Sequence, residues 1–158
     1  MRIGCDIGRV IIAPQHDDGR PDSTFLEGDE ELAMRVPAAP GAFDVLAECV
    51  EETSGNVWLV SKCGPRIAAR SMAWLRRQDF FQRTNIPEDH VIFCRERKDK
   101  ALHAVELQLT HFIDDRADVL LHLRGLVPNL ILFGPQKHRV SSEMIHAMNW
   151  ADVRRNIP

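Results

Sequence analysis

The sequence lacks the features that mark membrane-spanning, secreted and disulfide-linked proteins. None of its apolar runs approaches the roughly 20 residues that a membrane-spanning helix needs. A charged residue, Arg2, interrupts the N-terminal apolar run, so we expect no signal peptide. The four cysteines are widely spaced and form no Cys-x-x-Cys pair, which favours reduced thiols over a disulfide framework or a zinc site. We therefore predict a cytoplasmic protein.

Several common functional motifs are also missing. The sequence has no Walker loop, no Gly-x-Gly-x-x-Gly run and no Ser-His-Asp order, and its seven histidines show no metal-ligand spacing. It also contains no internal repeats and no low-complexity segment. Any function must therefore depend on shorter motifs placed by the fold.

The composition is that of an ordinary globular protein. The 158 residues are 44% hydrophobic and 27% charged, and a chain of this length buries roughly two-thirds of its unfolded surface. We predict a single domain over residues 1–158, in which residues 13–40, rich in proline and acidic residues, form an irregular excursion. Residues 141–158 are predicted to form a C-terminal helix.

Charge is unevenly distributed, although the net charge of −3 is too small to indicate a polyanionic partner. Residues 1–61 contain 4 basic and 12 acidic side chains, whereas residues 62–100 contain 10 basic and 5 acidic ones. The basic segment could face a phosphorylated substrate or a nucleic acid. We favour a solvated helix face with adjoining loops, so the support for nucleic-acid binding is weak.

Short apolar runs alternate with amphipathic stretches along most of the chain. The apolar runs are bounded by Gly, Pro, Asn or charged residues, as buried parallel strands are, and they span residues 2–6, 56–60, 90–94, 110–113 and 129–133. The stretches between them repeat apolar residues at helical spacing. This alternation predicts an α/β fold, a three-layer Rossmann-like sandwich around a mainly parallel five-stranded sheet.

Polar residues stand where these strands end or where the next helix begins. They are Asp6, Ser61, Lys62, Asp114, Asp115, Lys98 and Lys100. Ligands bind at the carboxyl ends of parallel strands, so these groups should meet on one rim. Two carboxylates about 4 Å apart repel by roughly 4 kcal/mol at an effective dielectric near 20, so three of them call for a cation. Oxygen ligands suit Mg²⁺, and lysine and serine suit phosphoryl oxygens. The pattern therefore suggests metal-assisted phosphoryl transfer.

These residues resemble the four motifs of the haloacid dehalogenase (HAD) superfamily of aspartate-nucleophile hydrolases, over about residues 1–135. In chain order, the motifs are similar to residues 5–10 (CDIGRV), 60–62 (VSK), 100–102 (KAL) and 112–116 (FIDDR). The resemblance implies that Asp6 is the nucleophile, which accepts the phosphoryl group as an aspartyl-phosphate, and also a Mg²⁺ ligand.

The resemblance also implies roles for the other site residues. The backbone carbonyl of Gly8 and the carboxylate of Asp114 would bind Mg²⁺, and Asp115 would bind it through water or orient the lysine. Ser61 would bind a phosphoryl oxygen. Lys100, with Lys98 as the competing candidate, would neutralise the nucleophile and the phosphate. The predicted substrate-binding residues are Ile7, Gly8, Arg9, Ser61 and Lys62.

The sequence departs from the family pattern at Gly8, where the family has a second aspartate as its general acid-base. General acid catalysis contributes about 10²–10⁴ in rate, so the departure bears on turnover more than on phosphate binding. Arg9 and His16 are the candidates for supplying a proton instead. We predict a Mg²⁺-dependent phosphatase, and the alternative is a catalytically weak or inactive module that binds a phosphate group or a protein partner.

The spacing of the motifs leaves no room for a cap domain. Residues 13–40 are the only long insertion after the first motif, and one helix and one strand use up residues 62–97. We therefore expect an open site, which in this superfamily often serves a macromolecular substrate or a partner that acts as a lid. The substrate class and the oligomeric state stay open.

Overall fold

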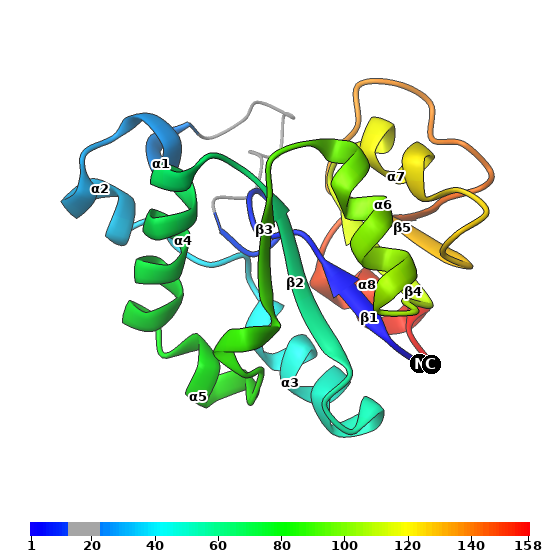
Figure 1. The fold of residues 1–158 in the computed structure, drawn as a ribbon, viewed down its shortest axis with the longest axis horizontal. Coiled ribbons are helices and arrows are strands. Elements are labelled where there is room, and N and C mark those ends of the chain that lie inside the picture. The colour runs from blue at the N-terminus through cyan, green and yellow to red at the C-terminus, as the bar shows by residue number, and fades with distance from the viewer. Residues whose placement is uncertain (13–22) are drawn as a thin grey trace.

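The computed structural model describes residues 1–12 and 23–158, and a parallel sheet runs through its centre (Figure 1). In the described part of the chain the sheet has six strands in the order β3-β2-β1-β4-β5-β6. The strands are β1 (Ile3–Cys5), β2 (Val57–Lys62), β3 (Val91–Cys94), β4 (His111–Asp114), β5 (Asn129–Phe133) and β6 (Ile145–Ala147). All neighbouring strands are parallel. The predicted α/β fold class is confirmed, and the strand number is six instead of five.

Helices cover both faces of the sheet. They are α1 (Thr24–Glu27), α2 (Glu30–Met34), α3 (Ala42–Thr53), α4 (Pro65–Arg77), α5 (Phe80–Thr84), α6 (Arg97–Glu106), α7 (Ala117–Leu123) and α8 (Trp150–Asn156), with a 3₁₀ turn at Glu88–His90. One core cluster contains side chains of α3, α4, α5 and α8, and a second contains side chains of α6 and α7. Within the described residues, no helix combines the length and the apolar character needed to cross a membrane.

Side chains of β2 alternate between the two core clusters. Val57 and Leu59 lie in the cluster on the α3 side, whereas Trp58 and Val60 lie in the cluster on the α6 side. Successive strand residues point to opposite faces, so a strand buried on both faces is apolar at every position. This explains the continuous apolar runs that predicted the strands.

The prediction of a helix over residues 141–158 is wrong for its first half. Residues 145–147 form β6, which pairs with the edge of β5 so that Ala147 lies opposite Phe133. Helix α8 begins only at Trp150, after Asn149, whose side chain accepts a hydrogen bond from the amide of Asp152. Pairing with a neighbouring strand outweighs the local preference in such a short segment.

Residues 23–40 are more regular than the predicted irregular excursion. They contain the short helices α1 and α2, and Asp29 caps α2 by accepting a hydrogen bond from the amide of Leu32. Ile12 and Ala38 form an isolated antiparallel bridge. The rest of the predicted excursion, residues 13–22 with His16, lies outside the described residues.

Trp150 connects the last helix to the loop that follows β1. Its indole N–H donates a hydrogen bond of 2.8 Å to the carbonyl oxygen of Val10, and its ring packs against Phe133 with centroids 5.7 Å apart. The side chain is 1% exposed. The C-terminal helix therefore supports the loop that begins at Asp6.

We expect Trp150→Phe to lower the free energy of unfolding by about 1–3 kcal/mol, because it leaves the buried Val10 carbonyl without its donor. Urea denaturation followed by circular dichroism measures the change. Trp58→Phe is the matched control, since the Trp58 indole N–H has no hydrogen-bond acceptor among the described residues. A loss in the control as large as in Trp150→Phe would show that ring size, and not the hydrogen bond, causes the effect.

Candidate active site

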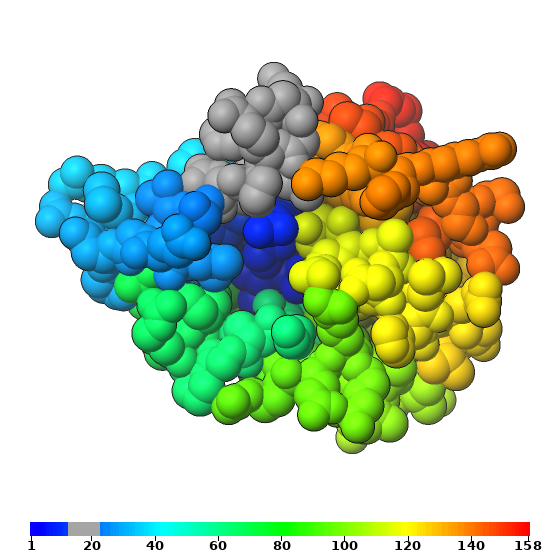
Figure 2. Space-filling model, turned by 90° about the horizontal axis from the view of Figure 1, so that it is seen from above, coloured from blue at the N-terminus to red at the C-terminus, as the bar shows by residue number. Residues whose placement is uncertain are grey.

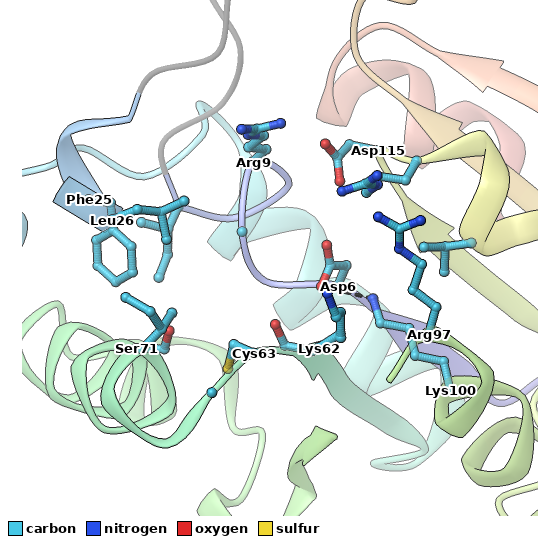
Figure 3. Close-up of a pocket in the computed structure, with 17 residues that line it drawn as sticks. Asp6, Arg9, Phe25, Leu26, Lys62, Cys63, Ser71, Arg97, Lys100 and Asp115 are labelled. Atoms are coloured by element: carbon cyan, nitrogen blue, oxygen red, sulfur yellow. Dashed lines mark ion pairs between the residues drawn. The ribbon is translucent and has the colours of Figure 1, made fainter. Parts of the chain in front are cut away.

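The predicted rim lies at the carboxyl ends of the central strands. Asp6 directly follows β1, Ser61 and Lys62 end β2, and Asp114 ends β4. Seen from above these ends, the N-terminal segment, drawn in blue, lies in a hollow at the centre of the face (Figure 2). A cavity of about 310 Å³ opens there, and Figure 3 shows its lining.

Three carboxylates gather beside this cavity. Asp6, Asp114 and Asp115 each offer an oxygen, and these oxygens lie within 4.8 Å of one another. The three residues are buried, with Asp114 fully inaccessible. The structure therefore brings together all three aspartates that the sequence placed at strand ends.

Lys100 pairs with two of these carboxylates. Its ammonium nitrogen is 3.1 Å from Oδ1 of Asp6 and 2.8 Å from Oδ2 of Asp114, and the residue is 2% exposed. Burial lowers the lysine pKa, but the two carboxylates outweigh that effect and raise it above its ordinary value. The ammonium group is thus held in its charged form.

One ammonium group does not balance three carboxylates. Burial, and after it the charge of Asp6, raise the pKa of Asp115 to about 8 and that of Asp114 to about 6. The ionised form of each carboxyl is thus disfavoured first by burial and then by the neighbouring carboxylates. The donor set is made of carboxylate oxygens, which suit a hard divalent cation. Asp6, Asp114 and Asp115 could therefore hold such an ion.

The loop after β1 is a tight turn around Ile7. The carbonyl oxygen of Ile7 accepts hydrogen bonds from the amides of Val10, Ile11 and Ile12, and Arg9 has a left-handed backbone with φ of 62°. Within the described residues, the amides of Ile7 and Gly8 donate to no protein acceptor. Both amides are therefore available to a ligand, and Gly8 lines the cavity.

The structure separates the two candidate lysines. Lys98 is exposed and pairs with Glu96 at 3.2 Å, whereas Lys100 reaches the carboxylates. Residues two positions apart lie about 200° apart around a helix, so only one can face the cavity. A capping box between Glu96 and Asp99 fixes the start of α6, which makes Lys100 that residue.

Ser61, Lys62 and Arg9 all line the cavity. Ser61 is buried, and its hydroxyl has no hydrogen-bond partner among the described residues, so it can bind a phosphoryl oxygen. The backbone of Ser61 pairs with Phe93 of β3, which holds the end of β2 in place.

Sequence reasoning missed one wall of the cavity. Phe25 and Leu26 of α1 line it and point toward the α4 side in Figure 3. Arg70, which is 9% exposed, donates hydrogen bonds from Nη1 to the carbonyl oxygens of Phe25 and Gly28. Arg66, one turn earlier on α4, donates to the carbonyl oxygen of Leu26. The expected open site is thus bounded on one side by α1.

Sequence reasoning also missed Arg97 and Arg116, which line the side of the cavity toward α6 and α7. Arg97 and Arg70 belong to the basic segment that we interpreted as a solvated face. That interpretation is wrong for these two arginines, since one lines the cavity and the other is buried. The available signal was their position in the sequence, since Arg97 lies three residues before the third motif and Arg116 is the last residue of the fourth.

Comparison with known proteins gives the fold. No family model and no curated protein sequence matches the chain. Among solved structures, D,D-heptose 1.7-bisphosphate phosphatase from B. bronchiseptica, complexed with magnesium and phosphate, superposes with a TM-score of 0.68 at 12% identity, over 99% of this chain and 98% of that one. A HAD-superfamily hydrolase from Ehrlichia chaffeensis gives 0.63 at 14% identity, over 99% and 95%. The chain therefore has the fold of HAD-superfamily hydrolases.

In metal-free protein, the raised carboxyl pKa values make the free energy of unfolding fall as the pH rises. Asp114 and Asp115 bind protons more tightly in the folded chain than at their ordinary pKa of 3.8. Their stabilising contribution is complete below about pH 4 and is lost as the pH rises through about 6 and 8. Urea denaturation in EDTA at a series of pH values measures this decline.

In Asp115→Asn, the free energy of unfolding should fall less between about pH 6 and 8 than in the native protein, because the substitution removes the group with the higher pKa. Asp79→Asn, at an aspartate that lies at the start of α5 and does not line the cavity, is the control. If the free energy of unfolding of Asp115→Asn fell as much as that of the native protein between about pH 6 and 8, the pH dependence would belong to another group.

Proposed function

We propose that this protein is a Mg²⁺-dependent phosphatase that hydrolyses phosphoric monoesters through an aspartyl-phosphate on Asp6. The observation that carries the proposal is the position of Asp6, paired with buried Lys100 and grouped with two further buried carboxylates at the cavity. The fold supports it, because one neighbour with this fold is a phosphatase complexed with magnesium and phosphate.

The carboxylate cluster fits a magnesium ion. Asp6, Asp114 and Asp115, with the backbone carbonyl of Gly8, would hold it, because their oxygen donors suit a small divalent cation. When bound, the ion supplies positive charge that offsets the negative charge of the phosphoryl oxygens. Asp115 must then be ionised, so binding releases protons near neutral pH.

In the first step, a carboxylate oxygen of Asp6 attacks the phosphorus atom. Lys100 engages Oδ1, so we assign Oδ2 as the attacking oxygen. A bond forms between Oδ2 and phosphorus, and the bond between phosphorus and the ester oxygen breaks, with its electron pair leaving on that oxygen. Ser61 and the amides of Ile7 and Gly8 bind the phosphoryl oxygens, and the Lys100 ammonium offsets their charge.

In the second step, water attacks the phosphorus of the aspartyl-phosphate. The bond between phosphorus and Oδ2 breaks, which restores the Asp6 carboxylate and releases inorganic phosphate. Both steps need a proton transfer, first to the leaving oxygen and then from the attacking water. Gly8 has no side chain to carry that proton, and His16 lies outside the described residues, so we assign both transfers to solvent water. Turnover is then slower than with a carboxyl group at position 8.

Gly8 also favours a second candidate function, a module that binds a phosphate group without rapid hydrolysis. The Lys100 ammonium, the Ser61 hydroxyl and the amides of Ile7 and Gly8 could bind a phosphate group without a general acid. Phosphate release from an aryl phosphate separates the two functions, because the module would bind phosphate in Mg²⁺ but release none.

Asp6→Asn should lower Mg²⁺-dependent phosphate release from an aryl phosphate by at least about 10³-fold, because the amide is a poor nucleophile. Asp44→Asn, at an exposed aspartate in α3, is the control and should keep full activity. Release that persists in EDTA, or that is equal in Asp6→Asn and the native protein, would contradict the proposal.

Gly8→Asp should raise turnover, because it places a carboxyl group beside Asp6. A Cβ atom built at Gly8 meets no atom of residues 1–12 and 23–158 within 4 Å, so these residues leave room for a side chain. For an alkyl phosphate, whose leaving oxygen needs a proton, we expect a gain of about 10²-fold. An aryl phosphate with an acidic phenol should gain less.

Gly8→Asn is the matched control, since it has the same shape but no exchangeable carboxyl proton. We expect it to leave the ratio of alkyl to aryl turnover at the native value. An equal gain in both variants would assign the effect to loop geometry and not to acid catalysis.

A further inference from the structure

The cavity beside Asp6 is more basic than a single phosphate group requires. Among the described residues that line it, five are cationic and two are carboxylates, although the whole chain has a net charge of −3. The cationic residues are Arg9, Lys62, Arg97, Lys100 and Arg116. A phosphate monoester carries about two negative charges at neutral pH. Lys100 is already paired with Asp6 and Asp114, which leaves the four positive charges of Arg9, Lys62, Arg97 and Arg116. The remaining positive charge points to a second anionic group.

Arg97 and Arg116 are positioned for such a group by a shared carboxylate. Arg97 is the first residue of α6 and Arg116 directly precedes α7. Nη1 of Arg97 pairs with Oδ2 of Asp118, and Nε of Arg116 lies 3.3 Å from Oδ1 of the same residue. One carboxylate thus holds two guanidinium groups at the cavity and leaves an excess positive charge between them.

Both guanidinium groups keep hydrogen-bond donors for a ligand. Within the described part of the chain, Nε and Nη2 of Arg97 and both Nη nitrogens of Arg116 donate to no protein acceptor. The two side chains are 35% and 48% exposed. In Figure 3, Arg97 extends from α6 toward the loop that carries Asp115. Guanidinium groups with open donors bind phosphate oxygens in a bidentate manner.

We propose that Arg97 and Arg116 bind a second phosphate group, so that the preferred substrate is a small molecule with two phosphates. The inference rests on the proposed function for the phosphate that is cleaved at Asp6. A volume of about 310 Å³ suits a small molecule. The apolar side chains of Phe25 and Leu26 lie on the opposite side of the cavity from Arg97 (Figure 3), where they can contact the carbon skeleton.

Matched substrate pairs test this assignment. We would measure kcat/KM in Mg²⁺ for glucose 1,6-bisphosphate against glucose 6-phosphate, and for adenosine 3′,5′-bisphosphate against adenosine 5′-monophosphate. The native protein should prefer the bisphosphate of at least one pair by about tenfold or more. Arg97→Gln and Arg116→Gln should each lower that preference by about tenfold, mainly through KM.

Arg124→Gln is the control, because Arg124 is an exposed arginine paired with Glu143 at 3.2 Å and does not line the cavity. It should leave the preference at the native value. Equal kcat/KM values within both pairs would overturn the assignment and leave the phosphatase standing. A loss of preference in Arg124→Gln as large as in Arg97→Gln would also overturn it.

Calorimetric binding of the same pairs to Asp6→Asn protein in Mg²⁺ separates the two proposals. Tighter binding of a bisphosphate, lost in Asp6→Asn/Arg97→Gln, supports the second phosphate site even if the native protein shows no turnover. Equal binding of both members of each pair overturns it. Tighter binding of an acidic phosphopeptide than of either bisphosphate would overturn the assignment to small molecules.

Discussion

The buried ion pairs of Lys100 are the interaction on which the site depends. Its ammonium group joins Asp6, from the end of β1, to Asp114, from the end of β4. Taking one carboxylate out of water costs several kcal/mol even after relaxation, and here three are buried together. Without the ammonium group the aspartates would take up protons or move apart. Lys100 therefore links the carboxyl ends of β1 and β4 beside the cavity.

The sheet order explains why these groups meet. β1 lies between β2 and β4, with Cys5 opposite Leu59 on one side and Ile113 on the other. The amide of Asp6 still donates to the Ile113 carbonyl, so the strand pairing continues up to Asp6. The chain then turns sharply around Ile7. A loop fixed in this way holds Gly8 and Arg9 at the cavity.

The walls of the cavity come from residues that bind the backbone or each other. Arg70 holds α1 through two carbonyl oxygens, and Asp118 holds Arg97 and Arg116. Arginines of the same basic segment have different environments, since Arg76 is an exposed partner of Glu88. Composition cannot separate these cases, because the environment of each guanidinium group depends on the element packed against it. The sequence pattern alone therefore predicts one solvated face for the whole basic segment.

Much of the fold and the centre of the site could be predicted from the sequence. Buried strands have apolar runs, helices have a 3.6-residue period, and parallel strands must end on one edge, so Asp6, Ser61 and Asp114 were placed together from local pattern alone. Only the tertiary structure decided the rest. β6 depends on pairing with β5, and the choice of Lys100 over Lys98 depends on the phase of α6. The α1 wall and the Asp118 contacts join residues from different elements, and local periodicity does not specify which distant side chains will meet.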